Sequence, residues 1–233
     1  TGFAQPEGYE ISVTFKPFKN QYIYLGHYFG KQYPIIDSAL LNENGQTVFK
    51  GSKNLPGGIY LIGYPNKAGF FEILIDKEQR FSVIADTATI RSGVQFINSP
   101  GNELFVNYQQ QMAAYGSEIS AKRRQLAEAK TTADSAALYD RIDELDSLIK
   151  QYREDLIKNN PGNMLSEFLV TMREPELPES FKTPTSREDS LNAYYYFRNH
   201  FWDGVNFWDG RLAYTPFFDD KMDKYINELL PLN

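Results

Sequence analysis

A change in hydrophobic period near residue 98 is the feature that most constrains how this 233-residue chain can fold. Up to Phe96, short β-type runs are separated by turn residues such as Asn44-Gly45, a pair that suits a tight hairpin because both residues tolerate positive φ. Beyond residue 98 the apolar residues recur at helical spacing, with Ser99 as candidate N-cap and Pro100 at the first helical position. The pattern predicts an α+β chain with strands and helices in separate segments.

The N-terminal segment, residues 1–98, is predicted to form an antiparallel β-sandwich domain. Apolar and polar residues alternate from Tyr9 to Phe15, which is typical of an antiparallel strand with one face buried. Eight such runs at short, regular spacing favour a sandwich or an incomplete barrel. The predicted strands cover residues 9–15, 22–28, 35–41, 47–50, 59–64, 70–75, 81–85 and 89–96.

The C-terminal segment, residues 99–233, is predicted to be an all-α domain. Two helices of roughly 25 residues, separated by a break at residues 131–134, indicate a long antiparallel hairpin. In the second helix, apolar residues from Leu138 to Leu156 follow alternating steps of four and three, the spacing of a coiled-coil seam. Further helices are expected around Phe168, over residues 186–201 with Ser186 as N-cap, and after Pro216.

Composition excludes several classes of function. The net charge is −6 and no Lys/Arg cluster marks a nucleic-acid face, so nucleic acid is not an expected partner. No apolar stretch is long enough to cross a membrane. The absence of cysteine excludes disulfides, thiolate metal sites and a cysteine nucleophile. The charge is uneven: residues 1–98 hold 9 Lys and Arg against 8 Asp and Glu, and residues 99–233 hold 15 against 22.

The motif "FWDGVNFWDGRL" at residues 201–212 contains both tryptophans of the chain and is the candidate contact surface. We interpret the two Phe-Trp pairs first as core anchors of the helical domain, and as a platform for a ligand or partner if they are exposed. Carboxylates beside aromatic rings also fit a sugar-cleaving site, which makes Asp203 or Asp209 a third, hydrolytic hypothesis. The candidate surface residues are Trp202, Trp208, Asp203, Asp209 and Arg211.

No catalytic, cofactor-binding or metal-binding residue is predicted. His27 and His200 are far apart in sequence, and no Gly-x-Ser-x-Gly elbow accompanies them. Two lone histidines do not form the cluster that a zinc or iron site needs. The segment "GSKNLPGG" lacks the order of a phosphate-binding loop and is followed by a predicted strand. The chain is therefore expected not to be an enzyme by itself.

Five stretches of the chain carry a family resemblance: "GYEISVTFKPFKNQYIYLGHYFGKQYPIIDSALLNENGQTVFKG", "PGGIYLIG", "FFEILIDKEQRFSVIADT", "SPGNELFVNYQQQM" and "YYYFRNHFWDGVNFWDGRLAYTPFFDDKMDKYINELLP". They resemble the N-terminal region of thioredoxin-like thiol–disulfide interchange proteins of the bacterial cell envelope. Together they span most of residues 8–230. In that family a β-rich and a helical domain of unknown function precede a thioredoxin-like domain. The Cys-x-x-Cys motif of that last domain is missing here, and the family's helical region tends to extend past Pro231-Leu232-Asn233.

This resemblance implies a role and a location. The chain would be a non-catalytic accessory region that positions substrates for, or presents them to, a C-terminal redox domain of the same protein. Its partners would be that domain and protein substrates, with no cofactor of its own. The implied location is the periplasm or cell envelope, where a lipid anchor could lie upstream of Thr1. The alternative is a glycan- or peptide-binding envelope module that uses the aromatic platform. The oligomeric state is left open, because the hairpin could pair with another chain.

Overall fold

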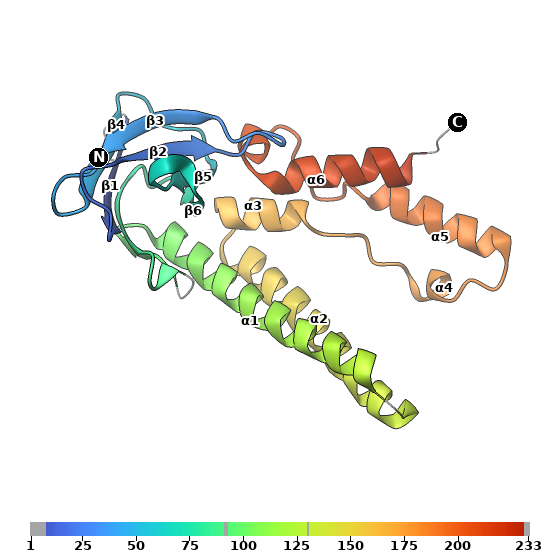
Figure 1. Ribbon diagram of the computed structural model, residues 1–233. Coiled ribbons are helices and arrows are strands. Elements are labelled where there is room, and N and C mark those ends of the chain that lie inside the picture. Colours follow the sequence, from blue (N-terminus) through green and yellow to red (C-terminus); the bar gives the residue numbers. More distant parts are fainter. Residues whose placement is uncertain (1–7, 91–92, 130, 231–233) are drawn as a thin grey trace.

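Two four-stranded sheets and a set of helices make up the computed structural model, which describes residues 8–90, 93–129 and 131–230 (Figure 1). This confirms the predicted α+β class and the order of its two parts. The first seven strands agree with the predicted runs to within one residue at each end. The eighth is shorter than predicted, and its run includes residues 91–92, which lie outside the described residues. The strands are β1 (Tyr9–Lys16), β2 (Tyr22–His27), β3 (Ile35–Leu40), β4 (Gln46–Gly51), β5 (Gly58–Gly63), β6 (Phe70–Ile75), β7 (Arg80–Asp86) and β8 (Gln95–Ile97).

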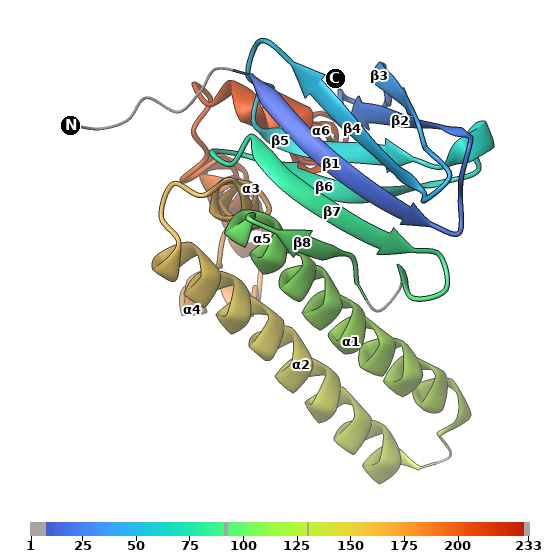
Figure 2. The ribbon, with the colours of Figure 1, turned by 90° about the vertical axis from the view of Figure 1, so that its left-hand side faces the viewer.

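The strand order is β4-β1-β7-β8 in one sheet and β3-β2-β5-β6 in the other (Figure 2). One pair departs from the predicted antiparallel pattern: β1 and β7 run parallel, with Glu10 opposite Arg80 and Lys16 opposite Asp86. A parallel pair needs a crossover connection, and here β5 and β6 of the opposite sheet lie between β4 and β7 in the chain. Strand β4 occupies one edge of β1, and β7 pairs with the other edge in the same direction as β1.

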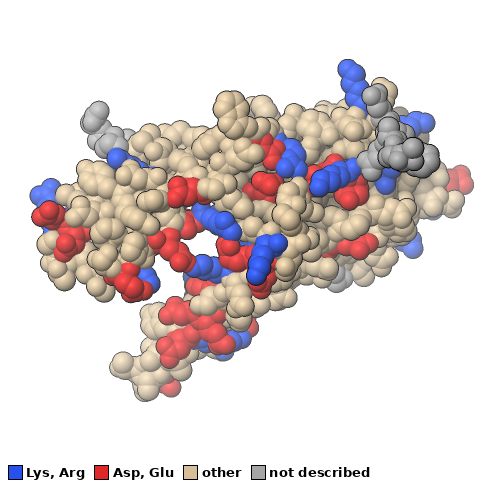
Figure 3. All heavy atoms as spheres, turned by 180° about the vertical axis from the view of Figure 1, so that it is seen from behind, with Lys and Arg blue, Asp and Glu red and all other residues tan. Residues whose placement is uncertain are grey.

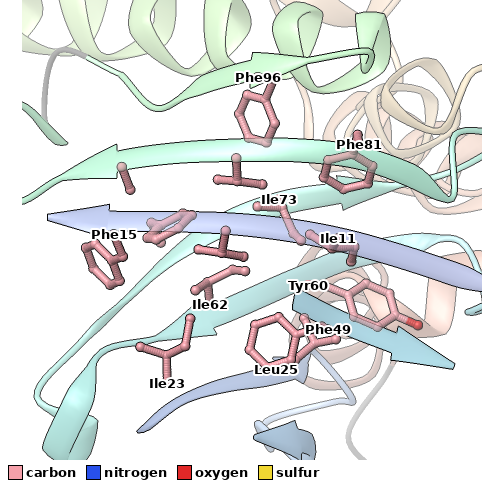
Figure 4. Packing of buried hydrophobic residues seen from close by; sticks show 14 of the residues in the cluster. Ile11, Phe15, Ile23, Leu25, Phe49, Tyr60, Ile62, Ile73, Phe81 and Phe96 are labelled. Carbon is pink, nitrogen blue, oxygen red and sulfur yellow. The ribbon is translucent and has the colours of Figure 1, made fainter. Parts of the chain in front are cut away.

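The first hydrophobic core lies between the two sheets (Figure 4). Phe15 is fully buried there, and its ring meets Phe18, Tyr64 and Phe71 edge-on at centroid distances of 4.9, 5.0 and 5.4 Å. This is the geometry that aromatic quadrupoles favour. The alternation predicted for β1 is observed, since Ile11 and Val13 are also buried.

The helical part begins immediately after β8. Its helices are α1 (Pro100–Glu128), α2 (Thr132–Asn159), α3 (Met164–Thr171), α4 (Glu179–Lys182), α5 (Arg187–His200) and α6 (Pro216–Lys224), with 3₁₀ helix η3 (Gly210–Tyr214) before α6 and π-helical turn η4 (Tyr225–Leu229) after it. Helices α1 and α2 form the predicted antiparallel hairpin, which extends away from the sheets in both ribbon views (Figures 1 and 2). Ser99 is the N-cap of α1 with Pro100 in its first turn, and Ser186 forms a capping box with Asp189.

Asn102, in the first turn of α1, joins the helices to the sheets. Its side-chain oxygen accepts a hydrogen bond from the Leu74 amide (2.6 Å), and its side-chain nitrogen donates to the Leu74 carbonyl (2.7 Å) and to Ser99 Oγ (2.9 Å). Asn102 thus occupies the free edge of β6 as a neighbouring strand would, and it satisfies backbone groups that would otherwise be buried unpaired.

A second hydrophobic cluster covers the outer face of the β3-β2-β5-β6 sheet. Strand residues Ile59, Leu61 and Leu74 pack there against Phe105 of α1 and Phe168 of α3. The boundary predicted at residue 98 therefore marks the change from strands to helices, while this apolar cluster extends across it.

Candidate functional site

The first Phe-Trp pair of the repeated motif is anchored where α5 ends. Phe201 is 2% exposed, and its ring stacks on Tyr225 at 5.7 Å. Gly204 closes the turn that follows, with φ of +79° and with Val170 next to the position that a Cβ would take. Most residues avoid this backbone conformation, so glycine fits the position. The prediction that this pair anchors the helical part is correct for Phe201.

Trp202 is half-buried and belongs to an aromatic cluster on the surface of the helical part. Its ring lies 5.3 Å from Phe207, 5.5 Å from Tyr225 and 6.1 Å from Phe218 of α6. Phe207 and Phe218 also contact each other, with ring centroids 6.1 Å apart. We call Trp202, Phe207, Phe218 and the neighbouring Trp208 the aromatic surface.

The second Phe-Trp pair points outward, and the prediction that it is a core anchor is wrong. Phe207 is 56% exposed and Trp208 is 96% exposed. The backbone amide of Trp208 donates to the Asn206 side chain (3.1 Å), which closes a tight turn. An indole ring can bury roughly 150–250 Å², so nearly all of this apolar area is available for a contact.

Arg211 holds the base of this loop against the sheets. Its guanidinium donates three hydrogen bonds to the Asp209 carboxylate (2.7–3.1 Å) and one to Oδ1 of Asp76, in the β6–β7 turn (2.9 Å). The other oxygen of Asp76 accepts a hydrogen bond (2.9 Å) from the backbone amide of Met164, the first residue of α3. One arginine thus links the loop, the sheet and a helix.

The same contacts fix the charge of Asp209. Its hydrogen bonds from Arg211 hold the pKa of the Asp209 carboxyl below its usual value, and Asp209 in turn raises the pKa of Arg211. A carboxylate held ionised by an arginine is poorly suited to general acid catalysis. The arrangement is that of a structural clamp.

Asp203 and Asp209 have different partners. Asp203 pairs with Nδ1 of His200 at 2.7 Å, and both side chains are exposed. His200 lies against the Tyr196 ring at 4.3 Å, on the wall of a pocket of about 380 Å³ that also includes Asp203. Of these two candidate carboxylates, the structure therefore places Asp209 on Arg211 and Asp203 on a surface histidine.

Two further residues of this region were not identified from the sequence. Asp76 is 135 positions from Arg211, and no local pattern connects the two. Lys221 of α6 is buried; its ammonium lies 4.3 Å from the Phe201 ring and donates to the Arg173 carbonyl at 2.5 Å. Burial lowers the pKa of Lys221 to about 8. Its position one helical turn from Phe218 was an available signal.

Other site types find little support in the described residues. Across 8–90, 93–129 and 131–230, no group of three or more His, Cys, Asp or Glu side chains is placed to hold a metal ion. Within the same ranges, no helix combines the length and apolar character needed to cross a membrane.

The fold and this surface define a two-sheet β-rich unit that carries a helical part with an exposed aromatic surface. Residues 9–105, from β1 to the first turn and a half of α1, match the model of the family described as Domain of unknown function (DUF4369). No curated protein and no solved structure matches the chain. The match ends before the aromatic surface begins.

Proposed function

We propose that the chain is a non-catalytic accessory region of a thioredoxin-like thiol–disulfide oxidoreductase, in which it positions protein substrates near a C-terminal redox domain. The observation that carries the proposal is the exposure of Trp208 and Phe207 on a loop with a fixed base. Such a loop loses little conformational entropy when it binds, which favours contact with apolar segments of partly folded proteins.

The mechanism we propose is tethering. A substrate held on the aromatic surface would have a raised effective concentration at a redox domain in the same chain. The Arg211 clamp supports this role because it restricts the loop relative to the sheets. The proposed setting is the periplasm or cell envelope, which fractionation of the producing cells would test directly.

The experiment compares disulfide reduction by the full-length protein with that of a Trp208→Ala variant. We expect the variant to reduce the disulfides of protein substrates about tenfold more slowly at low substrate concentration. The reason is that an aromatic hot spot contributes about 1.4 kcal/mol or more to the binding free energy. A small disulfide such as oxidised glutathione should be reduced at the same rate by both. Tyr139→Ala is the matched control, because Tyr139 is 58% exposed on the α1–α2 hairpin. Equal rates on protein substrates for wild type and Trp208→Ala would refute the proposal.

The alternative function is a glycan- or peptide-binding envelope module. The nearly complete exposure of Trp208 favours it, because an exposed aromatic face can stack on a sugar ring. A titration of residues 1–233 with oligosaccharides, in which binding is monitored by tryptophan fluorescence, separates the two hypotheses. Saturable binding of a sugar that Trp208→Ala abolishes would support the glycan-binding module over the substrate-positioning role.

A further inference from the structure

A pocket of about 570 Å³ lies where the β2–β3 turn meets α6. Its lining includes neither Arg211 nor Trp208. Its lining residues are Phe29, Gly30, Lys31, Gln32, Ala213, Thr215, Phe218, Asp219 and Asp223.

The β2–β3 side of the pocket is a closed turn. The backbone groups of Phe29 and Gln32 exchange two hydrogen bonds, each of 3.1 Å. Gly30 between them has φ of +56° and lies against the Asp219 carboxylate of α6. Because the turn is fixed by its own hydrogen bonds, this wall of the pocket is preorganised.

Aromatic rings form the apolar part of the wall. Phe29 is 54% exposed, and Phe218 is half-buried. Phe218 also contacts Trp202 and Phe207, so the pocket is continuous with the aromatic surface. The faces of aromatic rings attract cations as well as apolar groups.

Carboxylates form the polar part. Asp219 and Asp223 line the pocket, and Asp220 lies beside them on α6. The Lys31 ammonium reaches Asp223 at 2.5 Å, and that hydrogen bond, with the charges of Asp223, Asp219 and Asp220, raises the pKa of Lys31. The site therefore already holds a lysine ammonium from its own chain, and two carboxylates, those of Asp219 and Asp223, line the pocket around it.

Lys31 is held weakly. Its side chain is 75% exposed and that of Asp223 is 43% exposed, and exposed ion pairs contribute little to stability. A lysine presented by another molecule, with apolar neighbours to cover Phe29 and Phe218, could replace it and gain apolar contacts that Lys31 does not make.

We propose that this pocket binds a lysine or arginine side chain flanked by apolar residues, in an extended segment of a protein partner, and that the incoming cation displaces Lys31. The negative charge of residues 99–233 favours such a partner over an acidic one. The proposal does not depend on a redox domain, and it is tested separately from the role of Trp208.

The test is an amide chemical-shift titration of residues 1–233 with two acetylated and amidated peptides, Gly-Leu-Lys-Leu-Gly and Gly-Leu-Glu-Leu-Gly. We expect the lysine peptide to shift the amides of Gly30, Lys31 and Ala213 in a saturable way, and the glutamate peptide not to do so. Asp223→Asn should weaken lysine-peptide binding about threefold, as expected for loss of an ion pair at a partly exposed carboxylate.

The decisive variant is Lys31→Ala, which removes the competing ammonium from an exposed turn. We expect it to tighten lysine-peptide binding about threefold or more. Lys19→Ala, on the exposed β1–β2 turn, makes the same change in net charge elsewhere and should leave binding unchanged. The proposal is overturned if the two peptides bind equally, or if Lys19→Ala tightens binding as much as Lys31→Ala. The Lys31→Ala result holds even if Asp223→Asn lowers the unfolding temperature.

Discussion

Replacing Arg211 by methionine tests the clamp on which the position of the loop depends. Methionine keeps much of the side-chain volume and removes the charge. The side chains of Asp76 and Asp209 are 7% and 10% exposed, so the variant leaves two carboxylates with little access to water. Breaking a buried ion pair from one side costs 3–5 kcal/mol. Arg211 itself is 28% exposed, and the carboxylates keep hydrogen bonds from backbone amides, so we expect the free energy of unfolding to fall by about 3 kcal/mol.

The effect should depend on pH in a defined direction. In the folded protein the pKa of Asp209 lies below its usual value of 3.8. A carboxyl with a depressed folded pKa contributes stability that is present above the unfolded pKa and is lost as the pH falls through the folded pKa. The destabilisation caused by Arg211→Met should therefore be largest near pH 7 and should shrink below about pH 4, where the carboxylates become protonated.

The assay is urea unfolding of wild type and Arg211→Met at pH 7 and at pH 3.5, followed by circular dichroism. Lys182→Ala is the control: it breaks an ion pair with Glu179 in which the side chains are 54% and 87% exposed, and it should cost less than about 1 kcal/mol. A loss for Arg211→Met no larger than that control, or one that is equal at the two pH values, would refute the clamp.

Three further predictions concern packing and charge. Asn102→Ala should lower the free energy of unfolding by about 2–4 kcal/mol, because it leaves the buried amide and carbonyl of Leu74 unpaired; hydrogen exchange of the Leu74 amide should increase selectively, and unchanged exchange would contradict this. The pKa of Lys221 is about 8 in the folded protein and 10.5 in the unfolded chain, so the free energy of unfolding should rise with pH between these values. Urea unfolding of wild type and of Lys221→Met from pH 7 to 9.5 should show this rise in wild type and not in the variant. Trp208→Ser should change stability by less than about 0.5 kcal/mol, whereas Phe201→Ala should cost about 3–5 kcal/mol in the same urea assay; equal costs would contradict their opposite exposures.

Much of the fold was predictable because its signals are local. The alternation of Ile11 and Val13 with polar residues follows from the two faces of a strand, and Ser99-Pro100 is a helix start that requires no distant partner. Ser186 and Asp189 likewise cap α5 through contacts three residues apart. The parallel pairing of β1 with β7 was not predictable in this way, because it joins strands far apart in the chain that are connected through the strands of the other sheet.

The candidate surface shows the same division. Its residues were identified from the motif, but its two identical Phe-Trp-Asp-Gly units differ in burial. In the first unit Phe201 is buried and Trp202 is half-buried, while in the second Phe207 and Trp208 are exposed. Nothing within either unit distinguishes them. The difference comes from what lies beside each one, with Tyr225 stacked on Phe201 and with Asp76 holding the loop through Arg211.

The sequence by itself determined the kinds of element, their order and the change from strands to helices, because hydrophobic period and capping act over a few residues. Only the tertiary structure decided which aromatic rings face water, that Arg211 binds Asp76 as well as Asp209, and where Lys31 meets α6. Those outcomes depend on contacts between segments far apart in the chain, and burial and electrostatic pairing are properties of such contacts.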